Sequence, residues 1–240
     1  MRHQIGRDQT PAARSSLSLQ TLAQLPRRTP ATLGWLLLLG AGTAVVKGML
    51  AEETSQRVLE AISTNPDNLA RHPLLCLTAS PFVAADGTWL DHLLVVGLGL
   101  TICLGLLEWR IGTVRALAAA VSGHLGATLL TAVVVVAAVD AGRYPAEVMH
   151  ALDYGVSYAS IAAIAAVTPL LPRRMRRWWV AAAVLYPLTL ADWYGLLPDF
   201  TTVGHILSAA IGLVAGTAAV TLRRRGRRPA GTDPRGAASP

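Results

Sequence analysis

Residues 153–160 read Asp153-Tyr154-Gly155-Val156-Ser157-Tyr158-Ala159-Ser160. They lie near the start of an apolar run that continues to Leu171. A hydroxyl in such a run has little water to bond, so Ser157 needs a partner on its own helix or on a neighbouring one. The candidate partner is His205, at the head of the last apolar run. The chemistry open to this chain depends on whether the Ser157 and His205 side chains come within hydrogen-bonding distance.

The composition indicates a membrane protein with several spans. Of 240 residues, 52% are hydrophobic and only 15% are charged, which lies outside the usual range for a soluble domain. The net charge of +7 comes from arginines in the tails and in short loops between apolar runs. This is a pattern of membrane orientation, and it argues against a nucleic-acid partner. Cys76 and Cys103 have no metal-type spacing and receive no role.

The apolar runs predict an all-α membrane protein, a bundle of six transmembrane helices. The expected spans are residues 33–49, 90–107, 116–139, 150–171, 178–190 and 202–222. Residues 50–89 are too polar to span, although part of this segment is suited to the membrane interface. We therefore expect three regions: a basic, disordered cytoplasmic tail over 1–31, a membrane domain over 32–222, and a second basic, disordered cytoplasmic tail over 223–240.

The arginines also predict an orientation. Lys and Arg near span ends are retained preferentially on the cytoplasmic side. Both tails, the turn with Arg110 and Arg115, and the loop 173–177 fall on one side of a six-span bundle. Lys47, near the outer end of the first span, is the exception. We expect a multi-pass protein of the plasma membrane, in contact with the lipid bilayer and with both termini in the cytoplasm.

Depth and packing bring the polar groups together. The second, fourth and sixth spans run from outside to inside, and each carries a reactive group, His92, Ser157 or His205, within about its first two turns. In the last span His205 shares a stripe with Ser208, Gly212 and other small residues. Membrane helices approach closely along such stripes. The alternative is that the stripe only packs helices and that Ser157 bonds to a carbonyl of its own helix.

The second span and the turn after it carry a motif. His92 lies near the start of the span, and Glu108 begins the polar turn after it, which also contains Gly112, Thr113 and Arg115. This arrangement resembles the rhomboid intramembrane serine proteases, whose second helix carries a histidine and is followed by Glu-x-x-x-Gly and a basic residue. The order of spans is also similar, and the resemblance covers most of the membrane core.

The fourth and sixth spans extend the resemblance. Residues 155–158, Gly-Val-Ser-Tyr, match three of the four positions of the family's Gly-x-Ser-Gly, in which the serine is the nucleophile. Gly204 and His205, with Ser208 and Gly212, are similar to the last helix of the family, where the catalytic histidine lies on a small-residue stripe. A rhomboid-like bundle is therefore expected.

The resemblance implies a mechanism. Ser157 would be the nucleophile, His205 the base and His92 an oxyanion donor, with Gly155, Tyr158, Gly204, Gly212 and Asp153 as supporting or packing residues. No cofactor or metal is required. The substrates or clients would be membrane proteins, cleaved within or beside a transmembrane segment.

Three departures support a different outcome. Val96 stands where the family usually has Asn, Tyr158 replaces the glycine after the nucleophile, and Ile161 stands where an aromatic residue often stacks on the histidine. The first alternative is therefore a catalytically inactive rhomboid-like protein that binds membrane clients.

A second alternative is a zinc-dependent membrane hydrolase. His92, His150, His205 and Asp153 all fall near the outer face, and three imidazoles with a carboxylate are a plausible zinc set. The absence of a His-x-x-x-His pair on any span argues against it. Asp153, four residues before Ser157 and on the expected helix face, is also placed to bond to Ser157 or to His150.

Overall fold

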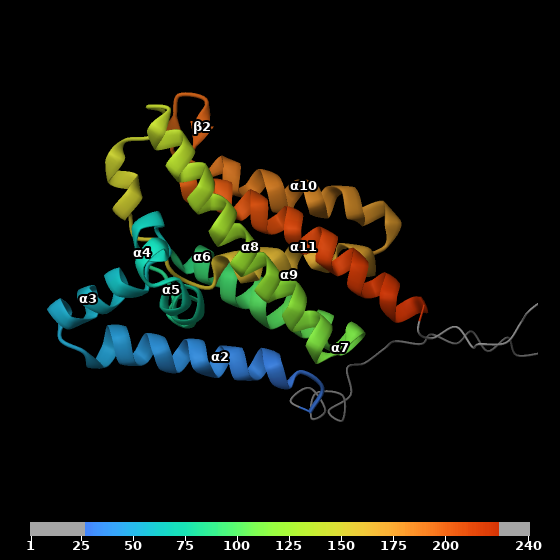
Figure 1. Ribbon diagram of the computed structural model, residues 1–240. Helices are drawn as coiled ribbons and strands as arrows, with labels where there is room; N and C mark the ends of the chain where they lie inside the picture. Colours follow the sequence, from blue (N-terminus) through green and yellow to red (C-terminus); the bar gives the residue numbers. More distant parts are fainter. Residues whose placement is uncertain (1–26, 226–240) are drawn as a thin grey trace, which may run out of the picture.

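The structure, a computed structural model, describes residues 27–225, and nearly all of it is helical (Figure 1). Its elements, in chain order, are α2 (Pro30–Thr43), η1 (Ala44–Met49), α3 (Glu52–Ile62), α4 (Pro66–Arg71), α5 (Pro73–Ala79), η2 (Ser80–Phe82), α6 (Trp89–His92), η3 (Leu93–Leu104), α7 (Gly105–Ile111), α8 (Thr113–Asp140), η4 (Ala146–His150), α9 (Ser157–Ala166), η5 (Thr168–Leu170), α10 (Arg173–Thr189), β1 (Trp193–Tyr194), β2 (Leu197–Pro198) and α11 (Phe200–Arg225). The two short strands pair in an antiparallel hairpin.

Four helical segments are long and apolar enough to cross a membrane: Pro30–Met49, Trp89–Ile111, Thr113–Asp140 and Phe200–Arg225. Their composition matches what a bilayer requires of a spanning helix, so the chain is a multi-pass membrane protein. The expected fourth and fifth spans correspond to α9, which is shorter, and to α10, which begins with four arginines in its first five residues. Four of the six expected spans are thus identified by length and composition.

The helix ends differ from the predicted boundaries. The first helix begins at Pro30 and the last ends at Arg225, so the helical region extends past 32–222 at both ends. The fourth helix begins at Ser157 and not near residue 150. The predicted tails lie almost entirely outside the described residues.

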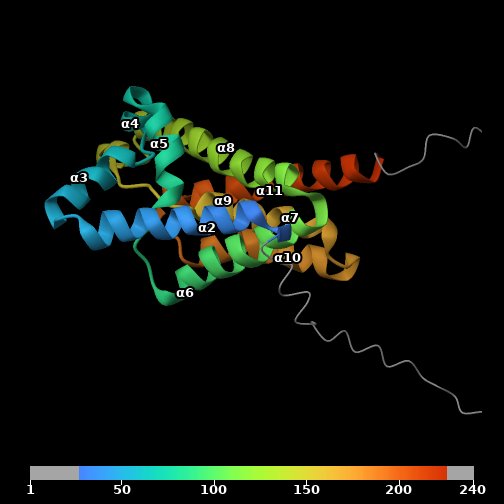
Figure 2. The ribbon, with the colours of Figure 1, turned by 90° about the horizontal axis from the view of Figure 1, so that it is seen from below.

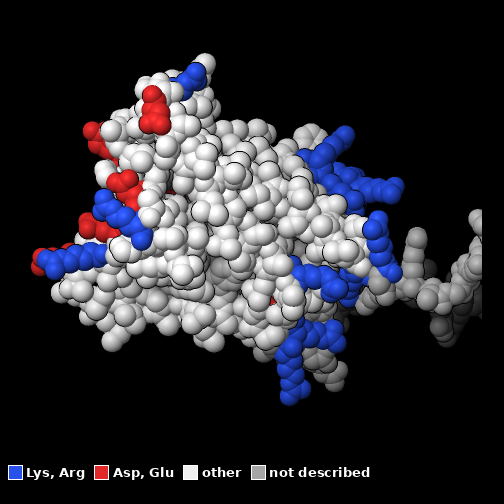
Figure 3. All heavy atoms as spheres, in the orientation of Figure 1, with Lys and Arg blue, Asp and Glu red and all other residues white. Residues whose placement is uncertain are grey.

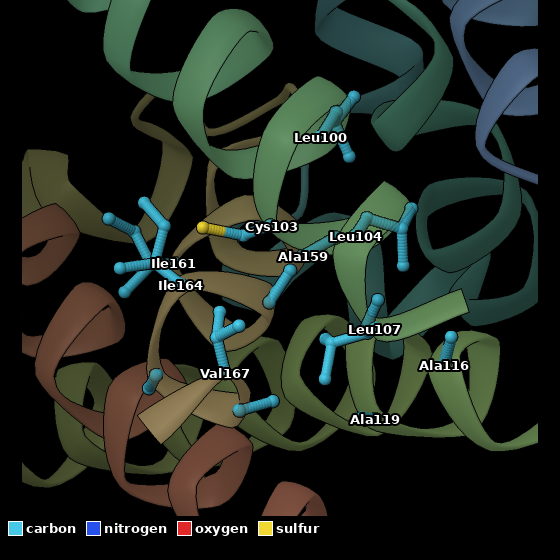
Figure 4. Packing of buried hydrophobic residues seen from close by; sticks show 14 of the residues in the cluster. Leu100, Cys103, Leu104, Leu107, Ala116, Ala119, Ala159, Ile161, Ile164 and Val167 are labelled. Carbon is cyan, nitrogen blue, oxygen red and sulfur yellow. The ribbon is translucent and has the colours of Figure 1, made fainter. Parts of the chain in front are cut away.

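Helix α9 forms the centre of the bundle. Every residue from Tyr158 to Ala166 is buried, and α9 packs against α8, α11 and η3. Figure 4 shows part of the core around it, with labelled side chains from η3, α7, α8 and α9 in one apolar cluster. A helix buried on all sides needs no amphipathic stripe, which explains its almost uniformly small and apolar sequence.

Small residues allow the helices around α9 to approach closely. A Cβ added to Gly212 would overlap the backbone of Ala162, and one added to Gly216 would overlap the backbone of Ala166. On another side, a Cβ added to Gly99 would lie 2.6 Å from the Cβ of Ser160. These contacts confirm that the stripe of the last helix packs backbone to backbone against α9.

The second span ends later than predicted. Residues from Glu108 were expected to form a polar turn, but the helix continues to the end of α7 and the chain turns at Gly112, which has a φ of +89°. Glu108 is 2% exposed. Its carboxylate accepts hydrogen bonds from the backbone N–H groups of Ala31 and Thr32, both at 2.9 Å, and from the hydroxyls of Thr32 and Thr113, both at 2.8 Å. Glu108 therefore caps the first helix, where unpaired N–H groups favour a negative charge.

The long segment between the first two spans folds into the short helices α3, α4, α5 and η2. It packs against α2, as both views show (Figures 1 and 2). The indole N–H of Trp35 donates to the carbonyl of Pro81 at 3.3 Å, and the rings of Trp35 and Phe82 lie 6.1 Å apart. Within the bundle, a ring nitrogen of His124 lies 3.1 Å from the carbonyl oxygen of Leu77. No part of this segment is a candidate span, in agreement with its composition.

Charge is unevenly distributed along the bundle. In Figure 3 most acidic side chains gather, with a few basic ones, at the end that holds α3 and α4, while the basic side chains of the opposite end, near the start of α10 and the last turns of α11, are arginines. This asymmetry agrees with the pattern on which the predicted orientation rests.

Candidate functional site

Ser157 is the first residue of α9 and follows the loop 151–156. The loop makes its last turn at Gly155, which has a φ of +117° and donates its N–H to the carbonyl of Ser80 at 3.0 Å. A Cβ added there would lie 3.1 Å from the Cβ of Ala85. Glycine is required by the backbone conformation as well as by the space, so Gly155 sets the position of Ser157.

The beginning of α9 offers free backbone donors. No side chain caps the helix at Val156, and the first N–H groups of a helix have no acceptor within it. The helix has ten residues and is therefore long enough for its N-terminus to carry a partial positive charge. Developing negative charge beside Ser157 would meet these N–H groups first.

His205 lies in the second turn of α11. Its ring packs edge to face against Tyr158, with the ring centroids 5.5 Å apart and the planes at 84°. Its Nε2 atom is buried and has no hydrogen-bond partner among the described residues. Nδ1 of the buried His124 is likewise without a partner among the described residues, so the free Nε2 leaves His205 able to accept a proton but does not by itself mark it as a base.

Ser157 and His205 line the same cavity, which has a volume of about 700 Å³, and His92 lines it too. Most of its wall is apolar and comes from η3, α9 and α10, with side chains that include Val95, Leu98, Ile161, Ile164, Trp179 and Ala183. Within residues 27–225, Ser157 and His205 make no hydrogen bond to one another. Catalytic hydrogen bonds are often long in an unliganded site and tighten only with substrate.

His92 is the last residue of α6, near the start of the second span, and is exposed. Its Nδ1 lies 2.8 Å from the carbonyl oxygen of Thr88. A carbonyl can only accept, so Nδ1 carries a proton and the Nε2 of a neutral His92 is an acceptor. The predicted oxyanion donor therefore requires the imidazolium form of His92.

Asp153 does not have the partners that its spacing suggested. It lies in the loop before α9 and not on the helix. Its carboxylate accepts hydrogen bonds from the hydroxyls of Thr64, at 2.9 Å, and Tyr158, at 3.2 Å. The expected bond to Ser157 or His150 is therefore wrong. His150 instead pairs with Asp67, at 2.7 Å, because η4, which ends at His150, packs against α4.

Tyr158 does not block the cavity. Its side chain is 2% exposed and is absent from the cavity lining. The ring lies over Gly204, where an added Cβ would overlap it. The bundle therefore accommodates a tyrosine in place of the glycine after Ser157. Tyr158 and Gly204, both predicted as supporting residues, pack against one another.

The four residues of the zinc alternative do not gather. His150 and Asp153 are engaged with Asp67 and Thr64. Among the described residues, no group of three His, Cys, Asp or Glu side chains lies close enough to hold a metal ion.

Four aspartates that line the cavity were not predicted as site residues: Asp86, Asp91, Asp192 and Asp199. Asp199 accepts from the N–H of Thr202 at 3.0 Å and from its hydroxyl at 2.8 Å, and so caps α11; the Asp-x-x-Thr spacing at a helix start was a usable signal. Asp86 forms an ion pair with Lys47 at 2.7 Å. Hydrogen bonds from Lys47 and Tyr154 hold the pKa of Asp86 below its usual range. This pairing explains why a lysine is tolerated near the end of the first span.

These features define a class: a polytopic helical membrane protein in which a serine at a helix start and a histidine on the adjacent helix open onto one cavity. The model of the family described as rhomboid-like protein matches residues 24–226, so the chain belongs to that family. No curated protein and no solved structure matches the chain.

Proposed function

We propose that this rhomboid-like protein is an intramembrane serine protease that cleaves membrane-spanning segments, with Ser157 as nucleophile and His205 as general base. The observation that carries the proposal is the shared cavity: Ser157 begins the central helix, and His205 lines the same cavity with a buried, unpartnered Nε2. No metal or cofactor is needed for this chemistry.

The reaction proceeds in two halves. His205 takes the proton of Ser157 as the hydroxyl oxygen attacks the substrate carbonyl, and the tetrahedral intermediate carries the negative charge. His205 then gives the proton to the leaving amine, and the peptide bond breaks to leave an ester on Ser157. His205 then takes a proton from water as the water attacks the ester. When the ester breaks, His205 gives this proton to the Ser157 oxygen, which restores the free hydroxyl and releases the acid product.

The first N–H groups of α9 support oxyanion stabilisation, because they lie beside Ser157 and have no acceptor within the helix. One such donor is typically worth about 3 kcal/mol of transition-state stabilisation. His92 is the second donor, in its imidazolium form. These donors replace the side-chain amide of the asparagine that the family usually has at the position of Val96.

The wall of the cavity supports a membrane segment as substrate. It is apolar along η3, α9 and α10, whereas the aspartates of the cavity and His92 lie beyond the ends of these helices. An extended peptide from a transmembrane segment would keep its apolar side chains against the wall. We further propose that the protein lies in the plasma membrane with both termini in the cytoplasm.

A fluorophosphonate probe tests the dyad, because it reacts with a serine only when a base takes the proton. Purified protein in detergent is expected to be labelled at Ser157, found by mass spectrometry. Ser157→Ala should abolish labelling, and His205→Ala should reduce it nearly as far, because members of one catalytic unit fail together. Ser122→Ala is the matched control: Ser122 bonds to the carbonyl of Ala119 on its own helix and should leave labelling unchanged.

The His92→Ala variant should still be labelled by the probe but should cleave a transmembrane substrate more slowly. The loss in transition-state stabilisation should be no more than the roughly 3 kcal/mol of one oxyanion donor. If well-folded wild-type protein is not labelled, the protease proposal is wrong. The chain would then be a rhomboid-like protein that binds membrane clients without cleaving them.

A further inference from the structure

Tyr158 links His205 to a carboxylate. It directly follows Ser157, its ring packs edge to face against His205, and its hydroxyl donates to an oxygen of Asp153 at 3.2 Å. The side chain is 2% exposed and lies behind the cavity wall. A single buried residue therefore contacts the general base on one side and an acidic group on the other.

Helix α11 is shaped to receive this ring. Gly204, the residue before His205, leaves the space that the phenol occupies, since any Cβ there would overlap it. One turn further on, the Ser208 hydroxyl donates to the backbone carbonyl of Tyr158. The two contacts flank His205, so the position of Tyr158 and the position of the imidazole are set together.

Asp153 is in turn held by the first external segment. Thr64, between α3 and α4, shares its single hydroxyl hydrogen between the Asp153 carboxylate, at 2.9 Å, and the Asp153 carbonyl, at 2.8 Å, and donates its N–H to the same carbonyl at 2.6 Å. The Asp153 N–H donates to the Ser63 hydroxyl at 2.9 Å. These bonds fix the loop 151–156 to a segment about 90 residues earlier.

The Asp153 carboxyl has no cationic partner within residues 27–225. Burial raises its pKa. Hydrogen bonds are strong where water is excluded, and the loss of one leaves a polar atom unsatisfied. The hydrogen bonds that Asp153 accepts from Thr64 and Tyr158 therefore restrain the position of the Tyr158 ring.

We propose that Asp153 and Tyr158 are positioning residues for His205: the first external segment holds Asp153, Asp153 holds the Tyr158 hydroxyl, and the Tyr158 ring holds the imidazole toward Ser157. The inference rests on the proposed protease function. It has a physical reason, because no hydrogen bond from the described residues fixes Nε2 of His205. Without the ring the imidazole would sample other rotamers, and fewer molecules would be competent at any moment.

The test is the kinetics of fluorophosphonate labelling in four variants of the full chain. Tyr158→Leu removes the ring, Tyr158→Phe and Asp153→Asn weaken its attachment, and Tyr144→Leu is the matched control. Tyr144 is also buried, donates a hydrogen bond to the Pro198 carbonyl and packs against another tyrosine, and it belongs to a separate apolar cluster with Val135, Ala138 and Val148.

Tyr158→Leu is expected to lower the maximal labelling rate by roughly 2- to 12-fold, the worth of an aromatic pair expressed as a rate. The probe concentration at half-maximal rate should not change, because probe contacts are intact. Tyr158→Phe and Asp153→Asn should fall between Tyr158→Leu and the wild type, and Tyr144→Leu should match the wild type. A labelled wild type with equal maximal rates in Tyr158→Leu and Tyr144→Leu overturns this inference alone.

A second measurement separates positioning from loss of stability. Carbethoxylation of His205 by diethyl pyrocarbonate, followed by mass spectrometry, should be faster in Tyr158→Leu than in the wild type, with the exposed His150 as internal reference. Unchanged modification of His205 overturns the inference even if labelling falls. An unlabelled wild type overturns both the protease function and the positioning role, and leaves Tyr158 as a helix contact.

Discussion

Replacing Gly212 by alanine tests the contact that brings the two helices of the site together. The Cβ of the new side chain would lie 2.6 Å from the Cα of Ala162 and closer still to the Ala162 carbonyl oxygen. These are backbone atoms of a helix that is buried on all sides, so they cannot turn away as a flexible side chain could. Carbon atoms prefer a separation of about 3.5–4.0 Å, so α9 and α11 must part by about 1 Å.

The expected cost follows from this separation. Overpacking a tight interior typically costs about 1–3 kcal/mol, and the small residues on either side lose part of their contact energy as the gap opens. We expect Gly212→Ala to lower the free energy of unfolding by about 1–3 kcal/mol, and Gly212→Leu to lower it further. Because Ser157 and His205 lie on the two helices that separate, labelling by the fluorophosphonate probe should fall as well.

Gly40→Ala is the matched control. Gly40 lies on α2, and an added Cβ there meets nothing within 4 Å. Alanine is favoured over glycine in a helix by up to about 1 kcal/mol, so this variant should be as stable as the wild type or more so. The assay is thermal unfolding in detergent, followed by circular dichroism. Equal stability of Gly212→Ala and Gly40→Ala would refute the reasoning, since it would place Gly212 in an open environment.

Two other predictions concern the first helix and the orientation. Glu108→Ala removes the acceptor for the N–H groups of Ala31 and Thr32 and should lower the free energy of unfolding by roughly 2–4 kcal/mol. Glu108→Gln, which keeps one acceptor oxygen, should cost less, and equal thermal stability of all three proteins would contradict the cap. Reporter fusions after Arg177 and after Leu222 should both report cytoplasm and a fusion after Arg143 the exterior; an exterior signal at Arg177 would contradict the orientation.

The membrane class could be predicted from the sequence, because its cause is local. A long apolar run in a bilayer has to satisfy its backbone within itself, so it forms a helix wherever it stands in the chain. The same logic located His92, Ser157 and His205 within the first turns of their spans, and all three line one cavity. The stripe with Gly212 was also readable, because helix periodicity places its residues on one face.

The partners of the polar side chains were decided by tertiary structure. Glu108 was expected in a solvated turn and instead caps a helix start 76 residues earlier. Asp153 was expected to bond near its own position, and its carboxylate instead meets Thr64, 89 residues away. Tyr158, which replaces the glycine after the nucleophile, turns inward over Gly204 and does not line the cavity. Hydrophobic periodicity determines which face of a helix is buried, but a charged or polar group is satisfied by whichever donor the packing of distant segments brings within 3 Å, and no local pattern contains that information.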